Sequence, residues 1–270
     1  MLALPDLFSS HGRTALVTGG ATGIGRMCAE ALLRAGARVL IASRKAEVCE
    51  AAAKELSSFG PCEGFGGSLS SEAGVRELSA EVMKRTDRLD ILINNAGISW
   101  GRSFESFEWK GWDRVLTTNV TALFTLTRDL MPLLLAAAKP DRPANVINLG
   151  SVMGTVTQSE GAYSYSASKA AVQHLTRILA VEFAGRHVTF NTVAPGPFPS
   201  KMTEFSMGTA EGAAKAAAAV PAGRVGTPDD VAGVVLFLTG RGGAYTTGSV
   251  IPIDGGFSVY APPPLFESPA

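Results

Sequence analysis

Short apolar runs alternate along the chain with longer segments in which apolar residues recur at helical spacing. The short runs are rich in Val, Ile and Leu at every position, which is typical of strands buried on both faces. Alternation of such strands with helices predicts a parallel sheet, and right-handed crossovers favour a doubly wound α/β fold of about seven strands with helices on both faces. The expected strands are 13–18, 38–42, 62–67, 90–94, 145–149, 188–193 and 249–253, and the expected helices are 24–36, 45–58, 71–86, 111–138, 162–185 and 228–240.

No linker, repeat or shift in composition divides the sequence, so residues 1–260 are expected to form a single domain. Residues 197–227 are rich in Ala and contain Pro197, Pro199 and Pro221, which predicts an irregular segment that could act as a lid. Residues 261–270 form a proline-rich tail, which cannot continue a helix or a central strand.

Composition narrows the function classes. The 270 residues carry no formal net charge, and Lys and Arg are scattered, so we expect no nucleic-acid partner. The start of the chain lacks the pattern of a signal peptide, and no uninterrupted apolar run reaches the roughly 20 residues of a membrane span. Three cysteines without metal-like spacing predict free thiols and no metal site. A cytoplasmic protein without a membrane partner is therefore expected.

A glycine-rich turn follows the first expected strand, in the order Thr-Gly-Gly-Ala-Thr-Gly-Ile-Gly over residues 18–25. Glycines at such a junction permit a tight turn and close approach of the backbone to a pyrophosphate, and the helix that follows offers free N–H groups to the anion. Many strand-to-helix turns carry two glycines, but this one lies at the first strand–helix junction. It therefore predicts a Rossmann-type dinucleotide site that includes Gly19, Thr22, Gly23, Ile24 and Gly25.

The end of the second expected strand favours one nicotinamide cofactor. A site for NAD carries a carboxylate there for the ribose 2′-hydroxyl, whereas this sequence has Ser43, Arg44 and Lys45. A guanidinium binds a 2′-phosphate with two charge-assisted hydrogen bonds. The alternative is an ordinary charged helix start. We expect NADP(H).

Tyr165 and Lys169 are one helical turn apart and share a helix face. The pKa of a phenol is ordinarily about 10, and an ammonium about 4 Å away stabilises the phenolate by about 4 kcal/mol at an effective dielectric near 20. We therefore expect a lowered pKa for Tyr165, although desolvation opposes part of the effect. Tyr163 is a rival, but Ala167 stands four residues after it, so it lacks a cationic partner.

Five short motifs occur in the order that is typical of the short-chain dehydrogenase/reductase superfamily, and the chain resembles that superfamily over essentially its whole length. The motifs are the glycine-rich turn, Asn-Asn-Ala-Gly at 94–97, Ser151, Tyr-Ser-Ala-Ser-Lys at 165–169 and Ala-Pro-Gly at 194–196. The segment 243–257 is similar to 3-oxoacyl-[acyl-carrier-protein] reductases, and to their rhamnolipid-associated branch above all. The resemblance implies an oxidoreductase that interconverts a ketone and a secondary alcohol by hydride transfer, with Tyr165 as acid/base.

The resemblance also implies roles for individual residues. Ser151 would hold the substrate oxygen, and Ser168 is its rival hydroxyl. Asn119 is an unfavourable residue within an expected helix, which suggests a bend or a bound water. A satisfied buried amide fits the residue type equally well, and the resemblance gives Asn119 a water that connects Lys169 to solvent. A serine stands at position 68 where an aspartate is common, so the adenine contacts are weaker there. The implied cofactor residues beyond the turn and Ser43, Arg44 and Lys45 are Ser68, Leu69, Asn95, Ala96, Gly97, Tyr165, Lys169, Pro195, Gly196, Phe198 and Ser200.

Apolar residues around the expected lid predict a hydrophobic carbonyl substrate or an acyl chain, unless they only pack the lid onto the domain. They are Met153, Val156, Phe198, Met202, Phe205 and Met207. The resemblance places Arg142 and Arg186 at positions where 3-oxoacyl-[acyl-carrier-protein] reductases have basic residues that face the acidic carrier protein. A CoA thioester is the alternative to an acyl carrier protein as the partner that carries the acyl group. Two alternatives to a 3-oxoacyl reductase remain. One is a broader carbonyl reductase or hydroxysteroid-type dehydrogenase, and the other is a non-catalytic NADP(H) sensor. Apolar residues around the helices 111–138 and 162–185 predict a homo-oligomer, and family members imply a tetramer.

Overall fold

A computed structural model describes residues 3–157, 161–200 and 202–259, apart from the side chain of Phe205. Seven parallel strands form one sheet in the order β3-β2-β1-β4-β5-β6-β7. This confirms the expected doubly wound single-domain fold, and each expected strand agrees with an observed one to within about two residues. The strands are β1 (Thr14–Thr18), β2 (Arg38–Ser43), β3 (Cys62–Gly66), β4 (Ile91–Asn94), β5 (Ala144–Leu149), β6 (Val188–Pro195) and β7 (Val250–Ile253).

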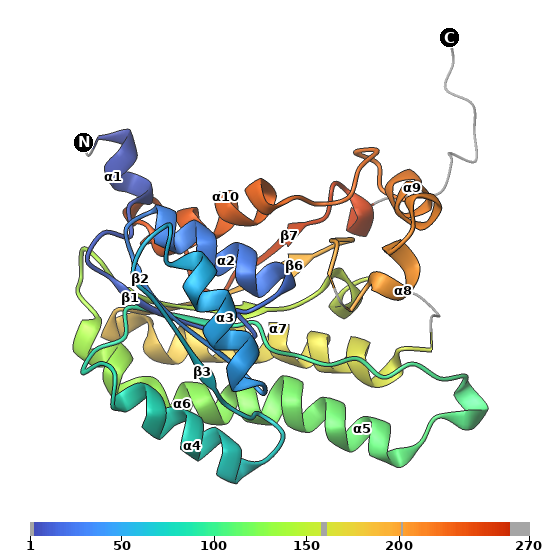
Figure 1. Ribbon diagram of the computed structural model, residues 1–270, viewed down its shortest axis with the longest axis horizontal. Coiled ribbons are helices and arrows are strands. Elements are labelled where there is room, and N and C mark those ends of the chain that lie inside the picture. The colour runs from blue at the N-terminus through green and yellow to red at the C-terminus, as the bar shows by residue number, and fades with distance from the viewer. Residues whose placement is uncertain (1–2, 158–160, 201, 260–270) are drawn as a thin grey trace.

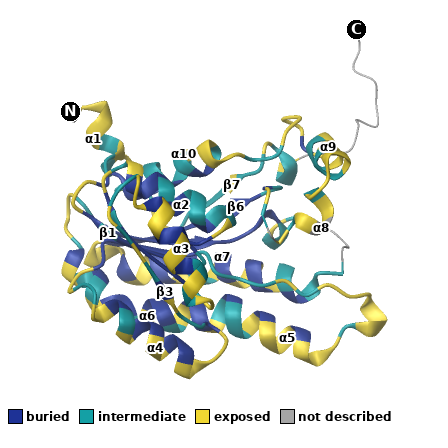
Figure 2. Cartoon of the chain, viewed as in Figure 1, coloured by how far each residue is buried: buried dark blue, intermediate teal, exposed yellow. Residues whose placement is uncertain are grey.

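Helices cover both faces of the sheet, and each is buried along the side that faces it (Figures 1 and 2). One face carries α2 (Gly23–Arg34), α3 (Ala46–Leu56) and α10 (Pro228–Thr239). The other carries α4 (Glu72–Met83), α6 (Ala122–Ala137) and α7 (Tyr163–Phe183), with α5 (Trp109–Leu116) running on into α6. The molecule is thus a three-layer sandwich, which leaves the carboxyl ends of the strands free to form a site.

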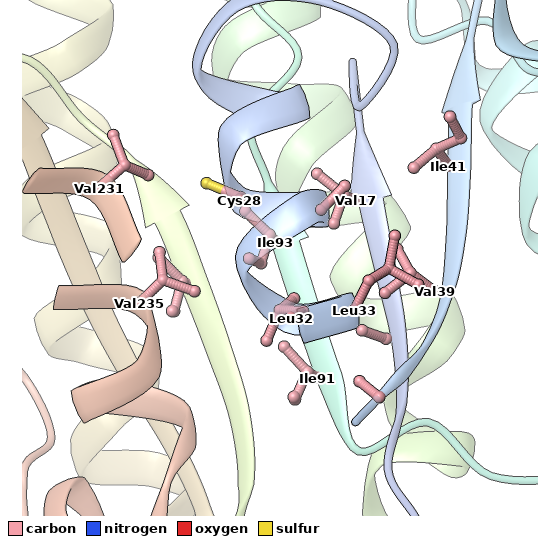
Figure 3. Close-up of a cluster of buried hydrophobic side chains, with 14 of the residues drawn as sticks. Val17, Cys28, Leu32, Leu33, Val39, Ile41, Ile91, Ile93, Val231 and Val235 are labelled. Carbon is pink, nitrogen blue, oxygen red and sulfur yellow. The ribbon is translucent and has the colours of Figure 1, made fainter. Parts of the chain in front are cut away.

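Aliphatic side chains bind the layers together. Figure 3 shows Val17, Val39 and Ile93 of the central strands packed against Leu32 of α2, while α10 adds Val231. A second cluster joins the opposite side of the same strands to α4, α6 and α7. Because both faces are buried, the strands contain apolar residues at successive positions instead of alternating ones.

A row of polar residues crosses the sheet within this apolar interior. Asn94, Asn148 and Thr192 are register partners on β4, β5 and β6. The Asn94 amide donates to the Asn148 oxygen at 2.9 Å and to Thr127 on α6 at 3.0 Å. Asn148 in turn donates at 2.9 Å to Thr176 on α7, which also accepts from Thr192. Among the described residues, the Asn94 side-chain oxygen has no hydrogen-bond partner. The other bonds of the row join three strands to two helices, and buried polar groups tolerate an apolar interior when they are paired.

Arg13 lies at the amino-terminal ends of the strands and forms hydrogen bonds to several elements there. Its side chain is 2% exposed, and its guanidinium donates to the Asn145 side chain at 2.7 Å and to the carbonyls of Asp90 and Pro143 at 2.8 Å each. It also donates to the carbonyl of Thr239 at the end of α10. The Arg13 Nε has no hydrogen-bond partner among the described residues and lies 3.7 Å from the Asp90 carboxylate. These contacts offset the cost of burying the charge.

Three details differ from the sequence-based expectation. The helix expected at 111–138 is divided by a π-helical turn, Thr117–Thr121, between α5 and α6. The segment 197–227 was expected to be irregular but contains α8 (Glu204–Met207) and α9 (Ala210–Ala218). Its prolines precede and follow these helices, and alanine is the strongest helix former. A short helix, α1 (Leu4–Phe8), was not expected. The proline-rich tail lies outside the described residues.

Within the described chain, one helical stretch, Trp109–Ala137, has the length and mean hydropathy of a membrane span. Half of its most apolar window is buried inside the structure, and α6 packs there against α4 and β5. A helix that forms the core of a layered domain passes the same test of length and composition, so this feature is explained by packing on the sheet.

Candidate active site

A cleft of about 740 Å³ opens at the carboxyl ends of the strands. Its floor consists of the last residues of β1, β2 and β6 and of the segments that follow β4 and β5. The strand order reverses between β1 and β4, and ligands of open α/β sheets bind at such a switch point. The cleft brings together Thr18, Ser43, Arg44, Asn95, Ser151, Tyr165 and Lys169, which are far apart in the sequence.

The glycine-rich turn forms one wall of the cleft. Gly19 and Gly23 have positive φ angles of 66° and 54°, a conformation that favours glycine. A Cβ atom on Gly25 would lie 2.3 Å from the Gly19 carbonyl oxygen, so Gly25 permits close packing within the turn but does not line the cleft. Thr22 precedes α2 without a side-chain cap, which leaves the first amides of that helix free for an anion. These features fit the pyrophosphate of a dinucleotide.

The cleft also borders the end of β2. Ser43 and Arg44 line it, and Arg44 is exposed with no ion pair among the described residues. Lys45 precedes α3 and does not line the cleft. The thiol of Cys49 donates to the Ser43 hydroxyl at 3.1 Å, a contact that the sequence gave no signal for. A single unpaired guanidinium therefore faces this end of the cleft.

The segment after β3 differs from the expectation for adenine. Leu69 and Ser70 line the cleft, whereas Ser68 does not. The Ser68 hydroxyl is 2.9 Å from the Ser70 hydroxyl and accepts from the Ser70 amide. The two hydroxyls thus bond to each other, and Ser70 is the one of these two serines that lines the cleft.

Tyr165, Lys169 and Ser151 meet at the other end of the cleft. Ser151 follows β5, and its hydroxyl accepts from the Met153 amide at 3.2 Å. The Lys169 ammonium donates to the Leu149 carbonyl at 2.6 Å and lies 5.5 Å from the centre of the Tyr165 ring. Tyr163 instead packs edge-on against Phe104 and Phe107, with ring centres 6.0 and 5.3 Å apart. Of the two tyrosines, only Tyr165 lines the cleft.

The expected lowering of the Tyr165 pKa is contradicted. Burial raises the pKa of the Tyr165 phenol, and the nearby Ser151 hydroxyl offsets part of this change. Burial also lowers the pKa of Lys169 to about 8. The Lys169 ammonium donates to the Leu149 carbonyl, and burial is the largest cause of the change in the Tyr165 pKa, so desolvation of the phenolate outweighs the stabilisation expected from the sequence.

Asn119 lies in the π-helical turn between α5 and α6, so the helical pattern is irregular at this residue. Its side chain accepts from the Ile98 amide at 2.9 Å and donates to the Ile98 carbonyl at 2.9 Å. It also donates to the Ser168 hydroxyl at 3.0 Å, which removes Ser168 as a rival to Ser151 because that hydroxyl faces Asn119. Asn119 does not line the cleft. It fixes the loop after β4, where Asn95, Ala96 and Gly97 do line it.

The segment after β6 closes the cleft. Pro195, Gly196, Phe198 and Ser200 line it, followed by Met202 and Thr203. The Phe198 ring rests on Gly226, where a Cβ atom would lie 2.1 Å from the ring, so the start and end of the segment 197–227 are packed together. In Figure 1, α8 and α9 lie at the right-hand side, near the start of α7. Of the other apolar residues expected at the substrate, Met153, Val156 and Met207 do not line the cleft.

Arg142 and Arg186 lie at the opposite edge of the sheet from the cleft, just before β5 and β6. The Arg142 guanidinium donates to the carbonyls of Ser9 and His11, at 3.4 and 3.0 Å. The Arg186 guanidinium stacks on the Phe183 ring at 5.1 Å. Within one protomer, neither residue borders the cleft, and carrier docking at these two residues stays a prediction.

Metal ligands were not expected, and the described residues hold no group of three His, Cys, Asp or Glu side chains placed to bind an ion. The three cysteines are free thiols, and burial raises the pKa of each, most strongly that of Cys28. Thiols of this kind are poor nucleophiles. Besides the Asp113 carboxylate, the groups that line the cleft and can donate or accept a proton are hydroxyls and the Lys169 amine.

Comparison with known proteins decides the family. Residues 19–258 match the family described as enoyl-(acyl carrier protein) reductase. A rhamnolipids biosynthesis 3-oxoacyl-[acyl-carrier-protein] reductase of Pseudomonas aeruginosa is 48% identical over 250 residues, which cover 93% of this chain and 98% of that protein. The chain belongs to the short-chain dehydrogenase/reductase superfamily.

Other members of the superfamily agree with this assignment. A 3-oxoacyl-[acyl-carrier-protein] reductase of Aquifex aeolicus is 36% identical over 248 residues, which cover 91% of this chain and 97% of that protein. The solved active-site complex of Pseudomonas aeruginosa RhlG with NADP superposes with a TM-score of 0.91 at 48% identity, over 94% of this chain and 99% of that one. The family resemblance drawn from the sequence motifs is confirmed.

Proposed function

We propose that this short-chain dehydrogenase/reductase is an NADP(H)-dependent cytoplasmic enzyme that reduces the ketone of a 3-oxoacyl thioester to a secondary alcohol. The observation that carries the proposal is the convergence of Tyr165, Ser151 and Lys169 on one end of a cleft whose other end presents Arg44. The names of its relatives support the substrate class. The apolar side chains of Ile98, Phe198 and Met202 beside the catalytic hydroxyls suit an acyl chain.

The protein's own groups supply the proton and hold the substrate. NADPH, when bound, supplies the hydride that the carbonyl carbon accepts. The Ser151 hydroxyl accepts from the Met153 amide, so its own hydrogen is free to hold the carbonyl oxygen. Tyr165 donates its proton to that oxygen as negative charge develops there. Because burial keeps the phenol protonated in the free protein, Tyr165 is ready to act as the acid in the direction of reduction.

We assign the remaining contacts to parts of the cofactor. The first amides of α2 and the glycine turn would bind the pyrophosphate of the cofactor. Asn95, Ala96 and Gly97 would line one of its two riboses. Pro195, Gly196 and Ser200 would bind the carboxamide. Lys169 would hold the second ribose through its ammonium, and Asn119 would hold a water that links Lys169 to solvent. Ser70, not Ser68, would contact the adenine edge, since only Ser70 lines the cleft.

Turnover with a defined thioester tests the proposal. We expect NADPH oxidation with acetoacetyl-CoA or with the acetoacetyl thioester of an acyl carrier protein, and much slower oxidation of NADH. Reaction with simple hydrophobic ketones but with neither thioester would favour a broader carbonyl reductase. NADPH binding without turnover of any ketone would favour a sensor.

Arg44→Asp is expected to reverse the cofactor preference. The guanidinium that would bind the 2′-phosphate is lost, and a carboxylate suited to the ribose 2′-hydroxyl of NADH replaces it. We expect kcat/KM for NADPH to fall about 100-fold, since hydrogen bonds to charged groups contribute about 1.5–3 kcal/mol each. Steady-state rates with both cofactors measure the change. Lys45→Asp is the matched control because Lys45 does not line the cleft, and an equal loss in that variant would contradict the role of Arg44.

The depressed pKa of Lys169 predicts opposite pH trends for activity and stability. Lys169 loses its proton as the pH rises through about 8, so we expect kcat/KM for NADPH, which reports the free enzyme, to fall above that pH. Between about 8 and the ordinary pKa of 10.5, the unfolded chain binds more protons at this residue than the folded one, so its contribution to stability rises with pH. Rate profiles and thermal melts from pH 7 to about 10 measure both trends; a flat rate profile would exclude this ammonium from catalysis.

The exposed apolar residues of α5, α6 and α7 support assembly into a homo-oligomer, and we propose a tetramer. Trp109, Trp112, Phe124, Ile178 and Val181 are exposed on these neighbouring helices. A patch of this kind is typical of an interface. Light scattering at micromolar concentration gives the mass, and a monomer of 28.0 kDa would exclude the proposal.

A further inference from the structure

The catalytic hydroxyl of Ser151 lies on a short turn that must be held in place. The turn is a single 3-10 helix, Val152–Gly154, that follows the end of β5. Within the turn, the Gly154 amide donates to the Ser151 carbonyl at 3.0 Å. Local bonds of this kind fix the shape of the turn, but they do not fix its position relative to Tyr165 on α7.

One side chain on α7 spans this turn. Gln173 is 5% exposed and does not line the cleft. Its amide nitrogen donates to the Ser151 carbonyl at 2.9 Å, and its amide oxygen accepts from the Thr155 hydroxyl at 3.1 Å. The two ends of one amide thus hold the first residue of the turn and the residue that follows it.

Gln173 also shares its helix face with the catalytic pair. It follows Lys169 by four residues and Tyr165 by eight, and residues at this spacing lie one above another on a helix. The bonds from Gln173 therefore set the distance between the turn that carries Ser151 and the helix that carries the other two groups.

The turn rests directly on the backbone of that helix. A Cβ atom on Gly154 would lie 2.9 Å from the Lys169 carbonyl carbon, 2.9 Å from the Ala170 amide nitrogen and 2.6 Å from the Gln173 amide nitrogen. Glycine at 154 permits this contact, and the Gln173 amide fixes its register. A buried amide with both ends paired is well suited to this purpose, since its geometry is rigid and its loss leaves the Ser151 carbonyl with one bond fewer.

We propose that Gln173 is a positioning residue that places the Ser151 hydroxyl against Tyr165 by holding both ends of the turn 151–155. The inference rests on the proposed function, in which Ser151 and Tyr165 share the substrate oxygen. Gln173 touches neither substrate nor cofactor and acts only through Ser151. A displacement of about 1 Å at a catalytic group can cost on the order of 100-fold in rate.

A double-mutant cycle tests this role. Gln173→Met keeps the length of the side chain and removes both hydrogen bonds. We expect kcat with an acetoacetyl thioester to fall about 10- to 100-fold while the Kd for NADPH, measured by fluorescence, is unchanged. In a Ser151→Ala background the same substitution should have no further effect on kcat, because residues that act as a unit are not additive. A further fall of equal size in that background would overturn the proposal, as would wild-type kcat in Gln173→Met.

Two more variants separate positioning from folding. Thr155→Val removes the bond at the other end of the turn and should lower kcat in the same manner by a smaller factor, which keeps the test valid if Gln173→Met does not fold. Asn191 offers a matched control: its buried amide donates to the Thr246 carbonyl at 2.8 Å and accepts from the Ser249 amide at 3.1 Å, and it does not line the cleft. Asn191→Leu should lower the melting temperature and leave kcat unchanged. An equal loss of kcat in Asn191→Leu would show that general destabilisation explains the result.

The outcomes for this inference and for the proposed function differ. If Tyr165→Phe and Ser151→Ala retain full turnover, the proposed function fails. If both lose turnover and Gln173→Met and Thr155→Val do not, only the positioning role fails.

Discussion

Tyr165→Phe is expected to lower kcat for reduction of a 3-oxoacyl thioester by about 10³-fold, within the range that a positioned general acid contributes. The phenol lines the cleft, and its raised pKa keeps it protonated in the free protein. Phenylalanine keeps the ring beside the Lys169 ammonium, so we expect the fold and the affinity for NADPH to be retained. The loss corresponds to about 4 kcal/mol of transition-state stabilisation. Stopped-flow absorbance of NADPH separates the chemical step from binding.

Tyr163→Phe is the matched control for that experiment. Tyr163 is on the same turn of α7, but its ring packs against Phe104 and Phe107 and it does not line the cleft. Removing its hydroxyl leaves those aromatic contacts in place, so we expect nearly full turnover. If the two variants lost activity equally, the assignment of Tyr165 as the acid would be wrong.

Arg13→Met is expected to lower the free energy of unfolding by about 3–5 kcal/mol, because each buried acceptor that loses its donor costs about 1–3 kcal/mol. The substitution removes the donors of three backbone carbonyls and of the Asn145 side chain, while Asp90, which is 5% exposed, keeps Arg88 at 3.3 Å as a cationic partner. For a chain of this size the melting temperature should fall on the order of 10 °C. Because Arg13 lies at the amino edge of the sheet, we expect kcat to change little below the melting transition.

The control for Arg13 is Arg38→Met. Arg38 pairs with Glu63 at 2.6 Å, but its side chain is 35% exposed and that of Glu63 is 48% exposed. A half-exposed pair contributes about 0–1 kcal/mol, so calorimetry at one protein concentration should show a much smaller shift. Similar shifts in melting temperature for the two variants would mean that burial does not determine how much the Arg13 contacts contribute to stability.

The apolar periodicity of the sequence was sufficient to predict the sheet, because the five central strands are buried on both faces and the helices between them are long enough to cross over. The functional residues of the cleft were predictable from the sequence where they belong to short local motifs. The turn at Gly19 and Gly23 and the spacing of Tyr165 and Lys169 are local. An irregularity of the helix at Asn119 was predictable, because an asparagine within a helix pattern competes for backbone bonds.

What the sequence did not show depends on partners that are distant along the chain. The Tyr165 pKa is raised because burial outweighs the ammonium, and spacing on a helix gives no measure of burial. Gln173 carries no motif, and its importance follows only from contacts with Ser151 and Thr155 on another element. The helices α8 and α9 were missed because prolines that bracket a helix were interpreted as interrupting one.

The polar row through β4, β5 and β6 has a consequence for recombining this enzyme with its relatives. Asn94, Asn148 and Thr192 belong to segments about 50 residues apart in the sequence but form one hydrogen-bonded unit with Thr127 and Thr176. A chimera whose crossover point falls between β4 and β6 inherits half of that unit from each parent, and mismatched halves leave an amide unpaired in an apolar interior. Crossover points before β4 or after β6 keep the unit whole, and libraries built that way should yield more folded proteins.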